Sequence, residues 1–145
     1  MSRTAARETA MKYIYSLDMN KDWDGEIEAV DEDSEFARQA EEDGDSVEGK
    51  DFDYINSVIS GVKENLEEID SLIDANTKSW KLSRISKIDL SIMRIAVYEI
   101  LYIEDIPHQV SINEAVRLAK KFGSADSSKF INGILGGIVR GLGIN

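Results

Sequence analysis

The chain contains no cysteine and only one proline in 145 residues. The absence of thiols excludes disulfide bonds and thiolate metal sites, and it suits a reducing compartment. The N-terminal stretch also lacks an apolar core of signal-peptide length, so we expect a cytoplasmic protein. The single proline and the scarcity of alternating β-branched runs favour helices over strands.

Residue types that usually carry catalysis are scarce as well. The only histidine, His108, follows Pro107 in a stretch that we expect to form a loop. No glutamate stands at the ExxH spacing of metal sites in helical bundles, and no Ser-His or Cys-His pair stands out. The C-terminal glycines precede no Lys-Ser or Lys-Thr, so they form no phosphate loop. We therefore expect a binding protein without a cofactor or metal, and not an enzyme.

Charge is distributed unevenly along the chain. The net charge is −11, yet residues 22–53 hold 15 acidic and two basic residues, which gives −13 for this segment and +2 for the remainder. We interpret residues 22–50 as a solvated, partly mobile segment, with a loop at 41–51. The other interpretation is an acidic surface that excludes nucleic acid. One short helix is predicted within the segment, anchored by Ile27, Val30, Phe36 and Ala37.

Residues 86–104 form the most apolar stretch of the chain. Their apolar side chains cannot all lie on one helical face, which is typical of a buried helix. The stretch has no charge-free span long enough to cross a membrane. Ser86, with Asp89 three residues later, predicts the start of the helix, and Pro107 predicts its end. We predict that the other helices pack around this one.

Two further helices are predicted in the first half of the chain from apolar residues at spacings of three and four. One covers residues 3–20, with Ser2 as its N-cap. A long amphipathic helix covers residues 51–75, with Asp51 or Asp53 as its cap. A short turn of core residues then leads to the central helix: Trp80, Leu82 and Ile85.

Two more helices are predicted after the proline. Ser111 and Glu114 form a capping box, and Gly123 is placed to end that helix. Asp126 can cap the last helix. Three glycines weaken this last helix and would let another helix approach closely: Gly133, Gly136 and Gly137.

Four motifs follow one another along the chain. They are ARETAMKYIYSLD at residues 6–18, MRIAVYEI at 93–100, IPHQVSINEAVRLAKKFG at 106–123 and KFINGIL at 129–135. In this order and at this spacing they resemble the NusB family. The most specific part is INEAVRLAKKFGSADSSKFINGIL at 112–135.

The resemblance implies an all-α fold, with residues 1–145 as a single domain of about six to seven helices arranged as two small helical bundles. It implies a transcription antitermination factor that binds boxA-type single-stranded RNA of ribosomal RNA leaders together with NusE, a small-subunit ribosomal protein. It also implies membership of the RNA polymerase antitermination complex. Homodimers occur among relatives, and a dimer could cover the RNA face.

The residues themselves and the resemblance together indicate site residues, because cations contact phosphates and aromatic rings stack on bases. Solvated surface arginines and a half-buried core tyrosine are the alternative interpretations of the arginines and the tyrosine in this set. The predicted RNA-binding residues are Arg3, Arg7, Lys12, Tyr15, Lys120, Lys121 and Lys129. The cations of this set would form one basic face if their helices are neighbours. The predicted partner-binding residues are Asp89, Phe122 and Asp126.

Two other functions stay open. A NusB-like adaptor that binds NusE with little RNA specificity is favoured by the sparse N-terminal arginines and by the acidic segment. A regulatory domain of an RNA methyltransferase is less expected, because 145 residues leave no room for a methyl-donor fold.

Overall fold

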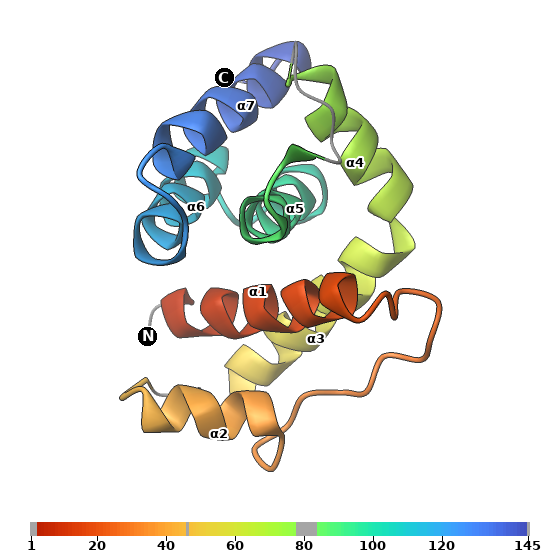
Figure 1. The fold of residues 1–145 in the computed structure, drawn as a ribbon, viewed down its shortest axis with the longest axis vertical. Coiled ribbons are helices and arrows are strands. Elements are labelled where there is room, and N and C mark those ends of the chain that lie inside the picture. The colour runs from red at the N-terminus through yellow and green to blue at the C-terminus, as the bar shows by residue number, and fades with distance from the viewer. Residues whose placement is uncertain (1–2, 46, 78–83, 145) are drawn as a thin grey trace. The chain divides into compact units, whose positions relative to one another are not determined.

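The computed structural model describes residues 3–45, 47–77 and 84–144, and within these ranges it has seven helices and no strand (Figure 1). The all-α prediction is therefore confirmed. The chain divides into two compact units, Met1–Glu64 and Asn65–Asn145. That the two units act as a single domain stays a prediction.

The first unit is built on α1 (Thr4–Met19), which packs against α2 (Glu35–Glu42) and α3 (Gly49–Glu64). The helix predicted at residues 3–20 is confirmed, and its apolar stripe is buried: Ala6, Ala10, Tyr13, Ile14 and Leu17. The stripe faces the core because its residues recur with the helical period. Ser2, the predicted N-cap, lies outside the described residues.

The acidic segment is less helical than predicted. The short helix α2 begins only at Glu35, so Ile27 and Val30 precede it in irregular chain. Val30 is nevertheless buried. Its backbone groups are both hydrogen-bonded, because its N–H donates to Asn56 Oδ1 (2.7 Å) and Asn56 Nδ2 donates to its carbonyl (2.9 Å). A side chain of α3 thus satisfies the buried backbone that a helix would otherwise satisfy. Helices also cover both ends of the loop expected at 41–51, because α2 ends at Glu42 and α3 begins at Gly49.

The helix predicted at residues 51–75 is wrong as a single element. It consists of α3 and α4 (Leu66–Ala75), separated at Asn65, whose φ is −114° and ψ is 19°. The apolar stripe continues across this break because α3 buries its part in the first unit and α4 buries its part in the second. Periodicity alone therefore cannot reveal the break. The helix begins at Gly49, so the prediction of Asp51 or Asp53 as its N-cap is wrong. Asp51 lies in the first turn of α3, where it accepts a hydrogen bond from the Glu48 N–H at 3.0 Å.

Helix α5 (Lys87–Tyr102) is the centre of the second unit, where it packs against α4, α6 (His108–Phe122) and α7 (Ser127–Gly141) (Figure 1). The predicted N-cap is confirmed, because Ser86 Oγ accepts a hydrogen bond from the Asp89 N–H at 3.1 Å. The helix ends at Tyr102, before the proline. Ile85 is buried as predicted, whereas Trp80 and Leu82 lie outside the described residues.

The predicted start of α6 is wrong. The helix begins at His108, so this histidine is helical and not in a loop, and Pro107 occupies the N-cap position. Proline is tolerated at a helix start because the first N–H groups have no intrahelical partner. Ser111 is therefore not a cap: it is buried inside the helix and donates a hydrogen bond to Glu99 Oε1 of α5 at 2.7 Å.

The chain around the α6–α7 turn is tightly packed. Gly123 ends α6 with extended backbone (φ −90°, ψ −172°), and a Cβ there would lie 2.5 Å from Ser127 Oγ. Asp126 holds the N-cap position of α7, but its side chain makes no capping hydrogen bond. Of the three helical glycines, only Gly137 meets another element, since a Cβ there would lie 2.6 Å from Asn76 Oδ1 after α4. Gly133 has nothing within 4 Å, so the predicted close approach is wrong at that position.

Candidate functional site

Two arginines at the start of α1 lie over one aromatic ring. The guanidinium carbons of Arg3 and Arg7 are 5.1 Å and 5.8 Å from the centre of the Tyr54 ring, which belongs to α3. At these distances a cation is attracted to the ring face. Arg3 is exposed, whereas Arg7 is only 5% exposed. The two arginines share a side of α1 as predicted, but they differ in how much of each a ligand can reach.

Lys12 carries the third cation predicted on α1, and carboxylates surround it. Its Nζ lies 3.3 Å from Asp43 Oδ2, just after α2, and 3.7 Å from Glu8 Oε1, one turn earlier on α1. The Lys12 side chain is 25% exposed. Any other anion that reaches Lys12 must compete with these two carboxylates.

Tyr15, the aromatic residue predicted to stack on bases, is half-buried in α1. This exposure fits both an aromatic platform and a half-buried core residue, so both interpretations stay open. Two residues earlier, Tyr13 is 8% exposed and stacks at 5.0 Å on Phe36 of α2. Tyr13 therefore serves the core of the first unit.

The predicted acidic residues of the second unit meet at a pocket between the start of α5 and the start of α7. Asp89 is 8% exposed, and its Oδ2 accepts a hydrogen bond from Ser127 Oγ at 3.0 Å. Among the described residues, no group hydrogen-bonds to its other oxygen, Oδ1. A buried oxygen without a partner is costly unless a ligand supplies one. The pocket has a volume of about 320 Å³, and Asp126 and Phe130 also line it.

The C-terminal cations lie on the surface of the second unit. Lys120 and Lys121 are exposed in the last turn of α6, where the negative end of the helix dipole favours them. Lys121 Nζ lies 5.3 Å from the centre of the half-buried Phe122 ring. Lys129 is exposed on the first turn of α7. The predicted single basic face joins these lysines to α1 of the other unit, and it stays a prediction.

Some residues of these sites were not predicted. Phe130 lines the Asp89 pocket and stands in the motif KFINGIL, so the motif itself was a signal for it. Ser127 and Arg84 line the same pocket without any sequence signal, because their place depends on how α5 meets α7. Tyr54, which lies under the two arginines, carried no sequence signal either, because its contact with them depends on how α3 packs against α1.

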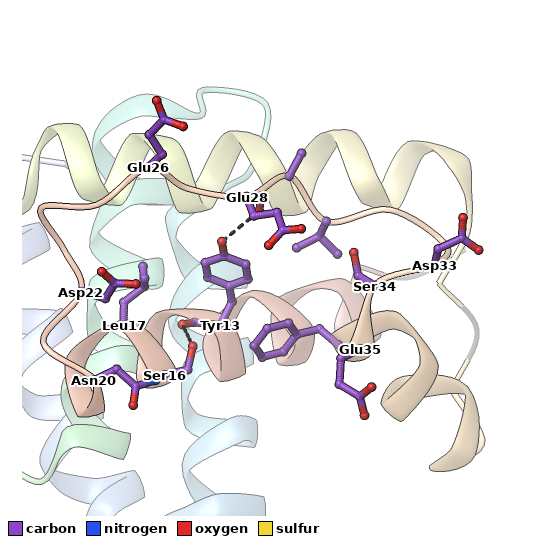
Figure 2. A pocket seen from close by; sticks show the side chains of 13 residues that line it. Tyr13, Ser16, Leu17, Asn20, Asp22, Glu26, Glu28, Asp33, Ser34 and Glu35 are labelled. Carbon is purple, nitrogen blue, oxygen red and sulfur yellow. Dashed lines mark hydrogen bonds between the residues drawn. The ribbon is translucent and has the colours of Figure 1, made fainter.

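A larger pocket of about 450 Å³ lies beneath the irregular chain of the acidic segment (Figure 2). Tyr13 donates a hydrogen bond to the Glu28 carbonyl at 2.9 Å across it, and burial raises the pKa of this tyrosine above its ordinary value. Figure 2 shows the carboxylates of Glu26, Asp33 and Glu35 pointing away from one another. Within the described ranges, no group of three histidine or acidic side chains could hold a metal ion. Nor does any described helix have the length and apolarity to span a bilayer.

The described residues thus form an all-α protein of two helical units, with lysines on the surface and a pocket lined by Asp89 and Asp126. The family model described as "NusB family" matches residues 4–140. A transcription antitermination protein NusB of Clostridium novyi is 43% identical over 141 residues, covering 97% of this chain and 99% of the relative. A NusB of Clostridium botulinum is 43% identical over 146 residues, covering 96% of this chain and all of the relative. The chain belongs to the NusB family, as the four motifs predicted.

Solved structures show the same fold. NusB of T. maritima is 31% identical with a TM-score of 0.76, covering 97% of this chain and 92% of that one. A chain of a crystal structure described as antitermination factors NusB and NusE in complex with dsRNA has a TM-score of 0.74 at 22% identity, covering 96% of both chains. The NusB fold of this protein is therefore shown over nearly the whole chain.

Proposed function

We propose that this protein is a transcription antitermination factor that binds boxA-type single-stranded RNA of ribosomal RNA leaders together with NusE. We propose further that it acts in the cytoplasm, within the RNA polymerase antitermination complex. The observation that carries the proposal is the match over nearly the whole chain to proteins named for antitermination. A structure of the same fold, described as NusB and NusE in complex with dsRNA, supports NusE and RNA as partner classes.

The surface cations are the proposed phosphate contacts. Arg3 and Lys12 on α1 supply them in the first unit, and the second unit supplies Lys120, Lys121 and Lys129. Each contact on a single strand contributes roughly −0.7 to the slope of log affinity against log salt concentration. Tyr15 is the proposed stacking residue, since single-stranded bases usually stack on aromatic side chains.

The proposed NusE surface comprises Asp89, Phe122 and Asp126. Asp89 Oδ1, to which no described group hydrogen-bonds, can accept a hydrogen bond from a donor that enters the pocket. Asp126 is exposed beside it and adds negative charge. A hydrogen-bond donor or a cation on NusE would thus satisfy this buried oxygen, which has no donor among the described residues.

The test is a fluorescence-anisotropy titration of labelled boxA RNA, with a scrambled RNA as control. It is run with the chain alone and with saturating NusE, at two salt concentrations. We expect specific binding that tightens with NusE, and by linkage RNA should tighten NusE binding by the same factor. Sedimentation of each sample identifies a homodimer, which would cover the RNA face.

Alanine variants of Arg3 and Arg7 test the N-terminal RNA site, and they should differ in their effect on stability. Arg3→Ala should weaken boxA binding about two- to tenfold. It should lower the free energy of unfolding by no more than about 0.5–1 kcal/mol, because its cation lies over Tyr54 at an exposed position. Arg7→Ala should also lower the free energy of unfolding by about 1–2 kcal/mol, because a packed cation over Tyr54 is lost. Unchanged affinity in Arg3→Ala would contradict the N-terminal RNA site.

The second candidate function is an adaptor that binds NusE with little RNA specificity. The burial of Arg7 and the carboxylates around Lys12 favour it, because they leave few open cations on α1. The same titration separates the two functions. A preference for boxA over scrambled RNA in the presence of NusE contradicts the adaptor, and equal weak binding of both RNAs supports it.

A further inference from the structure

We propose that Asp43 of the acidic segment competes with RNA phosphate for Lys12 and thereby weakens RNA binding. This inference rests on the proposed function, because it assigns a regulator to the same RNA site. The ion pair joins residues 31 positions apart, one on α1 and one just after α2. The fold therefore brings a carboxylate of the acidic segment onto a cation that the RNA is proposed to contact.

The position of Asp43 is unfavourable for its own helix. Asp43 is the C-cap residue of α2, where the helix dipole is negative and favours cations. The last turn of α2 carries no basic residue, and Glu41 and Glu42 precede Asp43 there. A carboxylate at this end gains from an external cation, and Lys12 supplies it.

The two carboxylates around Lys12 differ in how readily an anion can displace them. The Glu8 side chain is 5% exposed and lies on the same helix as Lys12, so it is held in place. The Asp43 side chain is 48% exposed and belongs to another helix. An ion pair this open to water is weak, so a phosphate that reaches Lys12 can replace Asp43. Asp43 then returns to solvent without loss of core packing.

The experiment compares Asp43→Asn with Glu42→Gln in the boxA titration, with saturating NusE present. Both variants remove one negative charge from the end of α2. Glu42 is exposed and forms no ion pair within the described part of the chain, so it controls for net charge. We expect Asp43→Asn to tighten RNA binding about two- to fivefold, the range of an exposed ion pair. We expect the salt slope to steepen by up to about 0.7, and Glu42→Gln to change both quantities by less.

A double-mutant cycle isolates the contact. In a Lys12→Ala background, the gain from Asp43→Asn should disappear, because the cation for which Asp43 competes is gone. A gain that persists without Lys12, or an equal gain in Glu42→Gln, overturns the inference while the proposed function stands. If the unmodified chain binds boxA no better than scrambled RNA, both the proposed function and this inference fail.

Discussion

Breaking the ion pair between Arg94 and Asp70 by removing one partner is predicted to destabilise the second unit strongly. Arg94 stands in the motif MRIAVYEI on α5, and Asp70 lies on α4. Arg94 Nε donates to Asp70 Oδ1 at 2.9 Å, and Nη2 donates to Oδ2 at 2.8 Å. The Arg94 side chain is 5% exposed and that of Asp70 is 19% exposed. The motif arginine therefore joins two helices and is not open to a nucleic acid.

Replacing Asp70 by alanine removes both of these hydrogen bonds from a buried guanidinium. Breaking a buried ion pair by removing one partner typically costs about 3–5 kcal/mol. Because Asp70 is partly exposed, water can solvate part of the arginine, and we expect a loss of about 2–3 kcal/mol. That is a large fraction of the stability of about 5–15 kcal/mol that a typical domain has.

Urea unfolding followed by circular dichroism measures this loss, with Asp74→Ala as the matched control. Asp74 is exposed on the same helix, and its replacement should change the free energy of unfolding by less than about 0.5 kcal/mol. Replacing the pair together, by Asp70→Leu with Arg94→Met, should recover most of the loss, because no buried charge is left unpaired. Equal stability of Asp70→Ala and Asp74→Ala would refute the reasoning.

The remaining predictions concern two glycines and one buried tyrosine. Gly123→Ala should lower the melting temperature, at a cost of about 1–3 kcal/mol, because its Cβ would lie 2.5 Å from Ser127 Oγ and 2.8 Å from the Ala119 carbonyl. Gly133→Ala should instead raise the free energy of unfolding by about 0.5–1 kcal/mol, because a Cβ at Gly133 would have no atom within 4 Å. A lower free energy of unfolding in this variant would contradict the packing. Burial raises the pKa of Tyr13 above 10.0, so its contribution to stability is complete below that pH and is lost as pH rises through the folded pKa. Urea unfolding at increasing alkaline pH should show a steeper loss for the unmodified chain than for Tyr13→Phe, and parallel curves would contradict it.

The sequence predicted the fold class and most helices because these depend on local periodicity. The stripe of α1 and the apolar surface of α5 were both visible as patterns, and Ser86 was recognised as a cap from its spacing to Asp89. The two errors at helix ends have one cause. The apolar pattern around Asn65 also fits one continuous helix, and the spacing of Ser111 to Glu114 also fits a helix cap. In both places the packing against another helix decides the structure, and the local sequence does not contain it.

The site residues divide in the same way. That Arg3, Lys12 and Asp89 carry charge, and that the chain resembles the NusB family, follow from the sequence alone. Only the tertiary structure decided that Lys12 faces a carboxylate 31 residues away, and that one oxygen of Asp89 is buried without a hydrogen-bond partner in the described part of the chain. The physical reason is that burial and ion pairing depend on which helix packs alongside, and that neighbour is distant in the sequence.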